Sequence, residues 1–287
     1  MTTTHIANRR AIGRLSGSLA ALGLLLGLAG LALNGTHRGP LRRAIIVDQL
    51  SLTAPNPSFV AQASATLRRA GFEVGYVSGT DVTVRFFESL PARGDDLILL
   101  RVHAARIIAA GSKTDDVALF SGETMDPWRD VVSGIPEGPA TAVALAREQS
   151  PAGQATPAGG TLSQEEKSRL IPVFYNPQDQ EVPIFGLRPA FIDQDLKGRF
   201  KESSVMVMMG CDGLRSTGLA DAFARRGVGT FIGWDDQVSG PHVDAATERL
   251  LELMLHDGVP IPEAVARTMV ELGPDRQYKG RMLLATH

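Results

Sequence analysis

The stretch SSVMVMMGCDGLRSTGLADAF, residues 203–223, decides the fold of this chain. Its first part is a run of valines and methionines, which is typical of a strand buried on both faces. A Gly-flanked turn follows, and GLADAFARRG then has the apolar spacing of a helix that Gly227 closes. Cys211, the only cysteine of the chain, lies at the exit of the strand. The stretch therefore predicts a strand–turn–helix unit with a thiol at the carboxyl end of its strand.

Similar strand patterns occur along the rest of the chain. They are short apolar runs that lead into polar residues, in AIIVDQL (44–50), FEVGYVSG (72–79), DDLILLRVHA (95–104), VALFSGE (117–123) and VGTFIGW (228–234). Two further extended pieces carry prolines that suit the edge of a sheet, in IPVFYN (171–176) and VPIFGLRPAFI (182–192).

Helical spacing with start and stop signals occurs between these runs, in PNPSFVAQASATLRRAGF (55–72), DVTVRFFESLP (81–91), HVDAATERLLELMLHDG (242–258) and PIPEAVARTMVELG (260–273). We expect the helix over 260–273 to be the last element of the chain. In DVTVRFFESLP a strand pattern competes with the helical one. Strands that alternate with helices predict an α/β fold with a mostly parallel central sheet and helices on both faces.

The composition fits one large globular domain, or a domain with an appendage. The chain has 287 residues, of which 44% are apolar and 21% are charged, and its formal net charge is −2. This balance gives no indication of a nucleic-acid partner. One cysteine cannot form an intramolecular disulfide, so core packing has to hold the fold. The histidines show no paired metal spacing and no Gly-rich phosphate loop follows residues 44–50, so the sequence predicts neither metal nor cofactor.

The N-terminal segment differs from the rest of the chain. A short basic tail (1–14) precedes an uncharged segment rich in Leu, Ala and Gly (15–34). A helix of this length spans roughly 28 Å, close to the hydrocarbon thickness of a bilayer. We therefore predict an uncleaved single-pass membrane anchor, followed by a linker (35–42) and one domain (43–287). A cleaved signal peptide, which would make the protein secreted, and a buried core helix are the alternatives. Arginines on both sides of the segment leave the side of the membrane open.

Residues 134–165 change in character, because they are rich in Pro, Gly, Ala, Thr and Gln. Such a composition buries little apolar surface, so it predicts a flexible surface excursion from the domain.

His103 and Cys211 each follow a predicted central strand, at its carboxyl end. In a parallel sheet these ends lie along one edge, where ligands and chemistry are usually found, and neighbouring strands are about 4.8 Å apart. An imidazole and a thiol at such ends form the pair that nucleophilic cysteine catalysis needs. The backbone N–H groups of Ala104 and Cys211 would then form an oxyanion hole. When each residue is considered alone, the alternative for Cys211 is a buried core cysteine, and the alternative for His103 is a histidine on a turn.

These segments resemble a known family. The pairing of DLILLRVHA (96–104) with SSVMVMMGC (203–211), and the sequence that follows it, are similar to the caspase-like cysteine peptidases of clan CD, especially the gingipain, clostripain and CHAT branches. The similarity covers about residues 43–272 and is most specific over 205–255. It implies a three-layer caspase-like fold, with His103 as general base and Cys211 as the nucleophile that forms a thioester acyl-enzyme.

The resemblance also points to residues for substrate binding. Asp235 or Asp236 matches an acidic position near the primary specificity pocket, and Trp234 would line the wall of that pocket. Ordinary turn residues are the alternative for both aspartates. Two positions depart from the family pattern: Ala104 replaces the usual Gly after the histidine, and Met209 occupies a position where some members carry Asp. A preference for substrates with Arg or Lys at the cleavage site would therefore require Asp235 or Asp236 to supply the negative charge.

Glu123 ends the run VALFSGE, which we expect at the same sheet edge as His103. It would orient the imidazole as the third member of a triad, and a loop carboxylate is the alternative.

The sequence thus predicts a membrane-anchored cysteine endopeptidase that acts on a peptide or protein substrate. Arg147 and Lys167 are candidate positions for autoprocessing in and near the excursion. A catalytically inactive, membrane-tethered binding or scaffold module is the main alternative. A ligand-binding protein of the periplasmic or flavodoxin type is a weaker alternative, because the sequence contains no ligand-binding motif.

Overall fold

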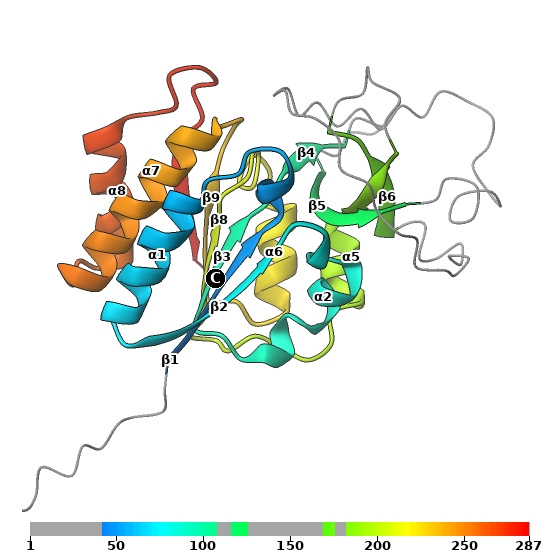
Figure 1. Ribbon diagram of the computed structural model, residues 1–287, viewed down its shortest axis with the longest axis horizontal. Helices are drawn as coiled ribbons and strands as arrows, with labels where there is room; N and C mark the ends of the chain where they lie inside the picture. Colours follow the sequence, from blue (N-terminus) through cyan, green and yellow to red (C-terminus); the bar gives the residue numbers. More distant parts are fainter. Residues whose placement is uncertain (1–41, 108–115, 126–168, 176–181, 287) are drawn as a thin grey trace, which may run out of the picture. The chain divides into compact units, whose positions relative to one another are not determined.

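The computed structural model describes residues 42–107, 116–125, 169–175 and 182–286. Their main feature is a six-stranded sheet with the strand order β10-β9-β8-β3-β1-β2 (Figure 1). Its strands are β1 (Arg42–Asp48), β2 (Phe72–Ser78), β3 (Leu97–Arg101), β8 (Val205–Met208), β9 (Thr230–Trp234) and β10 (Met282–Thr286). All neighbours are parallel except β9 and β10, which pair antiparallel. The prediction of a mostly parallel central sheet is confirmed.

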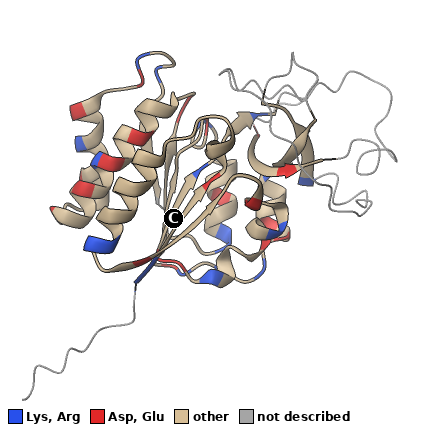
Figure 2. Cartoon of the chain, in the orientation of Figure 1, with Lys and Arg blue, Asp and Glu red and all other residues tan. Residues whose placement is uncertain are grey.

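Helices cover both faces of this sheet (Figure 1). On one face, α1 (Pro57–Arg69), α7 (Gly240–Leu251) and α8 (Ile261–Leu272) pack over alternate residues of the strands. On the other face lie α2 (Val84–Ser89), α5 (Pro189–Gln194) and α6 (Gly218–Arg225). Acidic and basic side chains are interspersed on the helices (Figure 2), which is typical of solvated surfaces. The helices expected over 55–72, 81–91, 242–258 and 260–273 are confirmed.

Short helical pieces complete the described chain. Three are 3-10 helices, η1 (Gln49–Leu52), η2 (Gly79–Asp81) and η3 (Pro91–Arg93), and a π-helical turn (Glu252–His256) continues α7. Of these, η1 bears on function, because it directly follows β1 at the carboxyl edge of the sheet.

A second sheet is antiparallel and has the strand order β4-β5-β7-β6. Its strands are β4 (Ala104–Arg106), β5 (Val117–Thr124), β6 (Leu170–Val173) and β7 (Ile184–Leu187). Because VALFSGE is β5, the expectation that it ends at the edge of the parallel sheet is wrong. A run that is buried on both faces has the same pattern in either kind of sheet, so the sequence did not separate the two.

Two other expectations need correction. The end of VPIFGLRPAFI is not extended, because Pro189 begins α5 at a position where proline is favoured. The chain also does not finish with a helix, since β10 follows α8 and forms an edge of the main sheet. Only five residues make up β10, too few to give a clear period in the sequence.

Within residues 42–107, 116–125, 169–175 and 182–286, the model contains no helix of the length and apolar character that a membrane span requires. The predicted anchor (15–34) and the excursion (134–165), with Arg147 and Lys167, lie outside the described residues.

Candidate active site

The sheet places His103 and Cys211 at the ends of two neighbouring strands. β3 and β8 pair in parallel from Leu97↔Val205 to Leu100↔Met208. The Met209 N–H donates to the Leu100 carbonyl at 2.7 Å, so the pairing continues past the end of β8. Extending this register by three residues aligns His103 with Cys211. Residues that are more than a hundred positions apart in the sequence thus follow neighbouring strands at one edge of the sheet.

Gly210 shows how closely these two ends approach each other. A Cβ atom at this position would lie 2.3 Å from the carbonyl oxygen of Val102 and 3.5 Å from the nitrogen of Ala104. Contacts as short as the first do not occur for real side chains, so the chain before Cys211 needs glycine here. The backbones on either side of His103 and Cys211 are therefore in direct contact.

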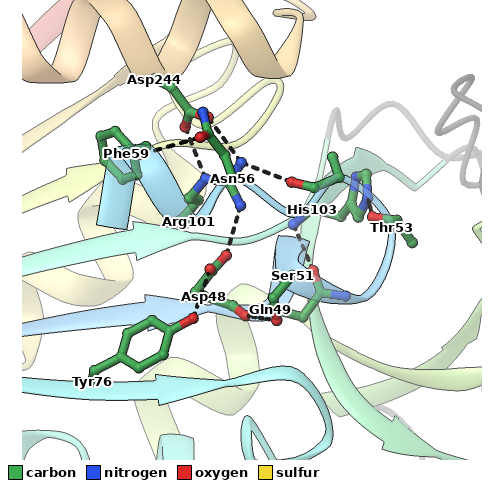
Figure 3. Close-up of polar contacts among 11 residues, drawn as sticks. Asp48, Gln49, Ser51, Thr53, Asn56, Phe59, Tyr76, Arg101, His103 and Asp244 are labelled. Carbon is green, nitrogen blue, oxygen red and sulfur yellow. Dashed lines mark hydrogen bonds and ion pairs between the residues drawn. The ribbon is translucent and has the colours of Figure 1, made fainter. Parts of the chain in front are cut away.

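The loop after β1 holds the imidazole of His103 (Figure 3). The Nε2 atom lies 2.6 Å from the Thr53 hydroxyl oxygen, and the His103 backbone N–H donates to the Gln49 side-chain oxygen at 2.9 Å. The ring also packs against Phe120 and Tyr175, with ring centroids 5.7 and 5.5 Å away. Sequence reasoning missed Gln49 and Thr53, and their position just after a buried strand was the available signal.

The environment of His103 favours its neutral form. Burial, and then the positive charge of Arg101, lower the pKa of His103 to about 4. At neutral pH the imidazole therefore carries no charge and can accept a proton, although its pKa lies below the neutral range in which a general base works best.

Arg101 belongs to a buried ion network directly before His103 (Figure 3). Its guanidinium bonds to Asp48 at 2.7 Å and to both carboxylate oxygens of Asp244 at 2.8 and 2.9 Å. It also donates to the Ala54 carbonyl at 2.9 Å, and Asn56 donates to Asp244 at 2.9 Å. The network thereby ties the loop after β1 and helix α7 to β3. No pattern in the sequence indicated this network.

The Cys211 side chain lies against the loop that precedes α7. Its sulfur accepts a hydrogen bond from the Val238 N–H at 3.5 Å and lies 3.6 Å from the carbonyl oxygen of the same residue. It packs with the core on the α1, α7 and α8 face. Within the described part of the chain, no hydrogen bond joins the imidazole of His103 to the thiol.

The strand geometry directs the Ala104 N–H toward β8. Ala104 pairs with Leu119 of β5, and the next residue, Phe120, donates its N–H to the His103 carbonyl at 2.9 Å. In an antiparallel ladder this makes Ala104 and Leu119 a non-hydrogen-bonded pair, whose N–H groups point away from each other. The Ala104 N–H therefore points away from β5, on the side where Gly210 approaches.

Two backbone hydrogen bonds flank Cys211, whose N–H is the other predicted oxyanion donor. The Met209 N–H donates to Leu100 on the β3 side, whereas the Asp212 N–H donates to the Asp236 carbonyl on the β9 side. Cys211 itself lies in the turn beyond the end of β8, between these two backbone hydrogen bonds. The direction toward Gly210 is thus established for the Ala104 N–H, and the Cys211 N–H remains a predicted oxyanion donor.

The predicted substrate-binding aspartates already have partners. The Asp235 carboxylate accepts the Arg281 N–H at 2.7 Å, and Asp236 pairs with Arg215 at 2.7 Å. Trp234 is 1% exposed and packs edge-on against His242 in the core. The surroundings of these residues therefore do not favour a pocket for a basic side chain.

Glu123 belongs to β5, and its carboxylate accepts the N–H of Val84, the first residue of α2, at 2.9 Å. Thr53 contacts the imidazole in the way that was expected of Glu123.

Among the described residues, no group of three or more His, Cys, Asp or Glu side chains has an arrangement that could hold a metal ion. No family model matches the chain, and a comparison with curated protein sequences finds no match. Function is therefore inferred from the geometry at the two strand ends.

Proposed function

We propose that this protein is a cysteine endopeptidase of the caspase-like type, with Cys211 as nucleophile and His103 as general base. The observation that carries this proposal is the register of β3 and β8, which aligns the two residues at the carboxyl edge of the sheet. A mostly parallel sheet with helices on both faces is compatible with the three-layer caspase-like fold. In the proposal, residues 15–34 attach the enzyme to a membrane.

In the proposed reaction, the neutral imidazole of His103 takes the proton of the Cys211 thiol. The resulting thiolate attacks the carbonyl carbon of the scissile peptide bond, and the carbonyl oxygen becomes an oxyanion. The N–H groups of Ala104 and Cys211 donate to this oxyanion. His103 then protonates the leaving amine as the C–N bond breaks, which leaves a thioester. Water, deprotonated by His103, hydrolyses the thioester and regenerates the thiol.

The thiol and imidazole each have another partner in the structure, since His103 contacts Thr53 and Cys211 contacts Val238. Proton transfer requires hydrogen-bond reach between them, and such contacts are often completed only in the substrate complex. These separate contacts also favour the second candidate function, an inactive module that uses the same edge to bind a peptide without cleaving it.

Degradation of a labelled protein tests the proposal. The full chain is incubated with fluorescently labelled casein, alongside Cys211→Ala and His103→Ala variants, and the release of small peptides is measured. We expect release by the native chain only. Intact mass spectrometry of the chain itself tests autoprocessing in parallel. A folded native chain that leaves both casein and itself intact, as the Cys211→Ala variant does, would support the inactive module instead.

A further inference from the structure

The turn after Cys211 carries three charged side chains, Asp212, Arg215 and Asp236, which we call the turn cluster. The Arg215 guanidinium nitrogen Nη1 lies 2.7 Å from Asp236 and 3.5 Å from Asp212. Asp212 and Arg215 belong to the turn, whereas Asp236 belongs to the loop after β9. Arg215 therefore bridges the segment that carries the nucleophile and the neighbouring loop.

Asp212 is an unusual residue for its position. It is 3% exposed, and its φ of 58° lies in the left-handed region that non-glycine residues seldom adopt. Among the described residues its oxygen Oδ1 has no hydrogen-bond partner, and the Arg215 charge at 3.5 Å is the largest effect that favours the carboxylate. Burial raises the pKa of Asp212, the charges of Arg215 and Arg106 lower it, and the charge of Asp236 raises it further. A strained backbone and a poorly bonded buried carboxylate are often features of functional sites.

Backbone hydrogen bonds join this turn to the loop that touches the thiol. The Asp212 N–H donates to the Asp236 carbonyl at 3.1 Å, and the Leu214 N–H donates to the Trp234 carbonyl at 2.8 Å. Val238, whose N–H reaches the Cys211 sulfur, is two residues beyond Asp236. The turn cluster thus lies on the segment that carries Cys211 and on the loop whose Val238 contacts the sulfur.

We propose that Arg215 is a positioning residue for Cys211: by bridging Asp212 and Asp236, it fixes the nucleophile turn and offsets the negative charge of the residue next to Cys211. This inference rests on the proposed function, because it concerns activation of the same nucleophile. It assigns Asp236 to the support of the thiol rather than to a substrate side chain.

The cluster has opposite effects on the thiolate. The carboxylate of Asp212, in the residue next to Cys211, disfavours a second negative charge, whereas the Arg215 guanidinium favours it. Two other charges act on Asp212: the positive charge of Arg106 favours a nearby negative charge, as that of Arg215 does, and the negative charge of Asp236 disfavours it. Removing the Asp212 charge therefore lowers the thiol pKa, and removing the Arg215 charge raises it.

Alkylation of the single cysteine tests this inference without a substrate. The rate of Cys211 alkylation by iodoacetamide is followed by intact mass from pH 5 to 10, in the full chain and in Asp212→Asn, Arg215→Gln and Arg215→Lys variants. We expect the pH midpoint to fall by about half a unit or more in Asp212→Asn, which is roughly a threefold faster reaction below the midpoint. It should rise by a similar amount in Arg215→Gln, and Arg215→Lys should restore most of the native value.

Arg225→Gln provides the matched control, because Arg225 also pairs with an aspartate, Asp193 at 2.7 Å, but on helix α6. It should leave the midpoint unchanged. A purely structural role would loosen the site and shift both Asp212→Asn and Arg215→Gln in the same direction. Shifts of the same sign, or no shift in either variant, would overturn the inference even if casein is cleaved. Opposite shifts in a protein that cleaves nothing would support it and count against the peptidase proposal alone.

Discussion

The Nε2 atom of His103 lies 2.6 Å from the hydroxyl oxygen of Thr53, a residue that immediately follows η1. This contact fixes the orientation of the imidazole from the loop after β1. In the proposed peptidase this neutral hydroxyl would take the orienting role that a third group has in catalytic triads, without adding a charge.

Replacing Thr53 should therefore reduce peptide cleavage. We expect Thr53→Val to lower casein cleavage about tenfold, because the imidazole loses its orienting contact. Thr53→Ser keeps the hydroxyl and should retain most of the activity, so it is the matched control. Equal activity in the two variants would show that this contact does not orient the base.

The low pKa of His103 gives a prediction about stability and pH. Because the folded-state pKa of about 4 lies below the ordinary value of 6.5, the unfolded chain binds a proton more readily. The stabilisation from His103 is therefore present above pH 6.5 and is lost as the pH falls toward 4. It amounts to about 3 kcal/mol at most.

Urea unfolding at pH 7 and pH 4.5 measures this contribution to the free energy of unfolding. Other groups also titrate over this interval, so the native chain is compared with His103→Asn, which should show a smaller loss of stability between the two pH values. A two-dimensional NMR titration of the His103 ring gives the pKa directly. A pKa near 6.5 would contradict the prediction.

Arg101 should be among the residues most important for stability. It is 1% exposed and bonds to two carboxylates that are also buried. Arg101→Met leaves Asp48 and Asp244 buried without a counter-charge, which typically costs about 3–5 kcal/mol. Urea unfolding measures this loss, and Arg225→Gln, which breaks an exposed pair, should cost far less. A similar loss in the two variants would mean that the buried network contributes little.

Gly210 should not tolerate a side chain. In Gly210→Ala the new Cβ would lie 2.3 Å from the Val102 carbonyl oxygen, so the ends of β3 and β8 would separate. We expect a loss of about 2 kcal/mol or more in the free energy of unfolding, together with a large loss of casein cleavage. Gly240→Ala is the control, because its Cβ would meet only the Ala54 side chain at 3.9 Å. Retention of full activity by Gly210→Ala would contradict the close approach of the two strand ends.

The elements that the sequence predicted well are those whose own residues carry the pattern. β1, β3, β8 and β9 are buried apolar runs, and α1 has a capping Asn56, a Pro at its start and basic residues in its last turn. The register that aligns His103 with Cys211 depends on which strands become neighbours. The positions at the two strand ends were predicted, but their alignment required the sheet order.

The side-chain contacts of the candidate site could not be predicted from the sequence. Thr53 and His103 are 50 positions apart, and Arg101 and Asp244 are 143 apart. No local periodicity reports such pairs, since each residue alone is an ordinary polar side chain near the end of an element. The assignment of β5 to a second sheet was missed for a related reason, because pairing partners are chosen by the tertiary fold.

His103 stands where the chain passes from β3, in the six-stranded sheet, directly into β4, in the four-stranded one. Its ring rests on Phe120 and Tyr175, which belong to or follow strands of the smaller sheet, whereas the sulfur of Cys211 rests on the loop before α7. The imidazole of His103 is thus held by the loop after β1 and by the smaller sheet together, whereas the thiol is held on the α7 side. In the proposed peptidase the base therefore joins the two sheets, whereas the nucleophile belongs to the larger sheet alone.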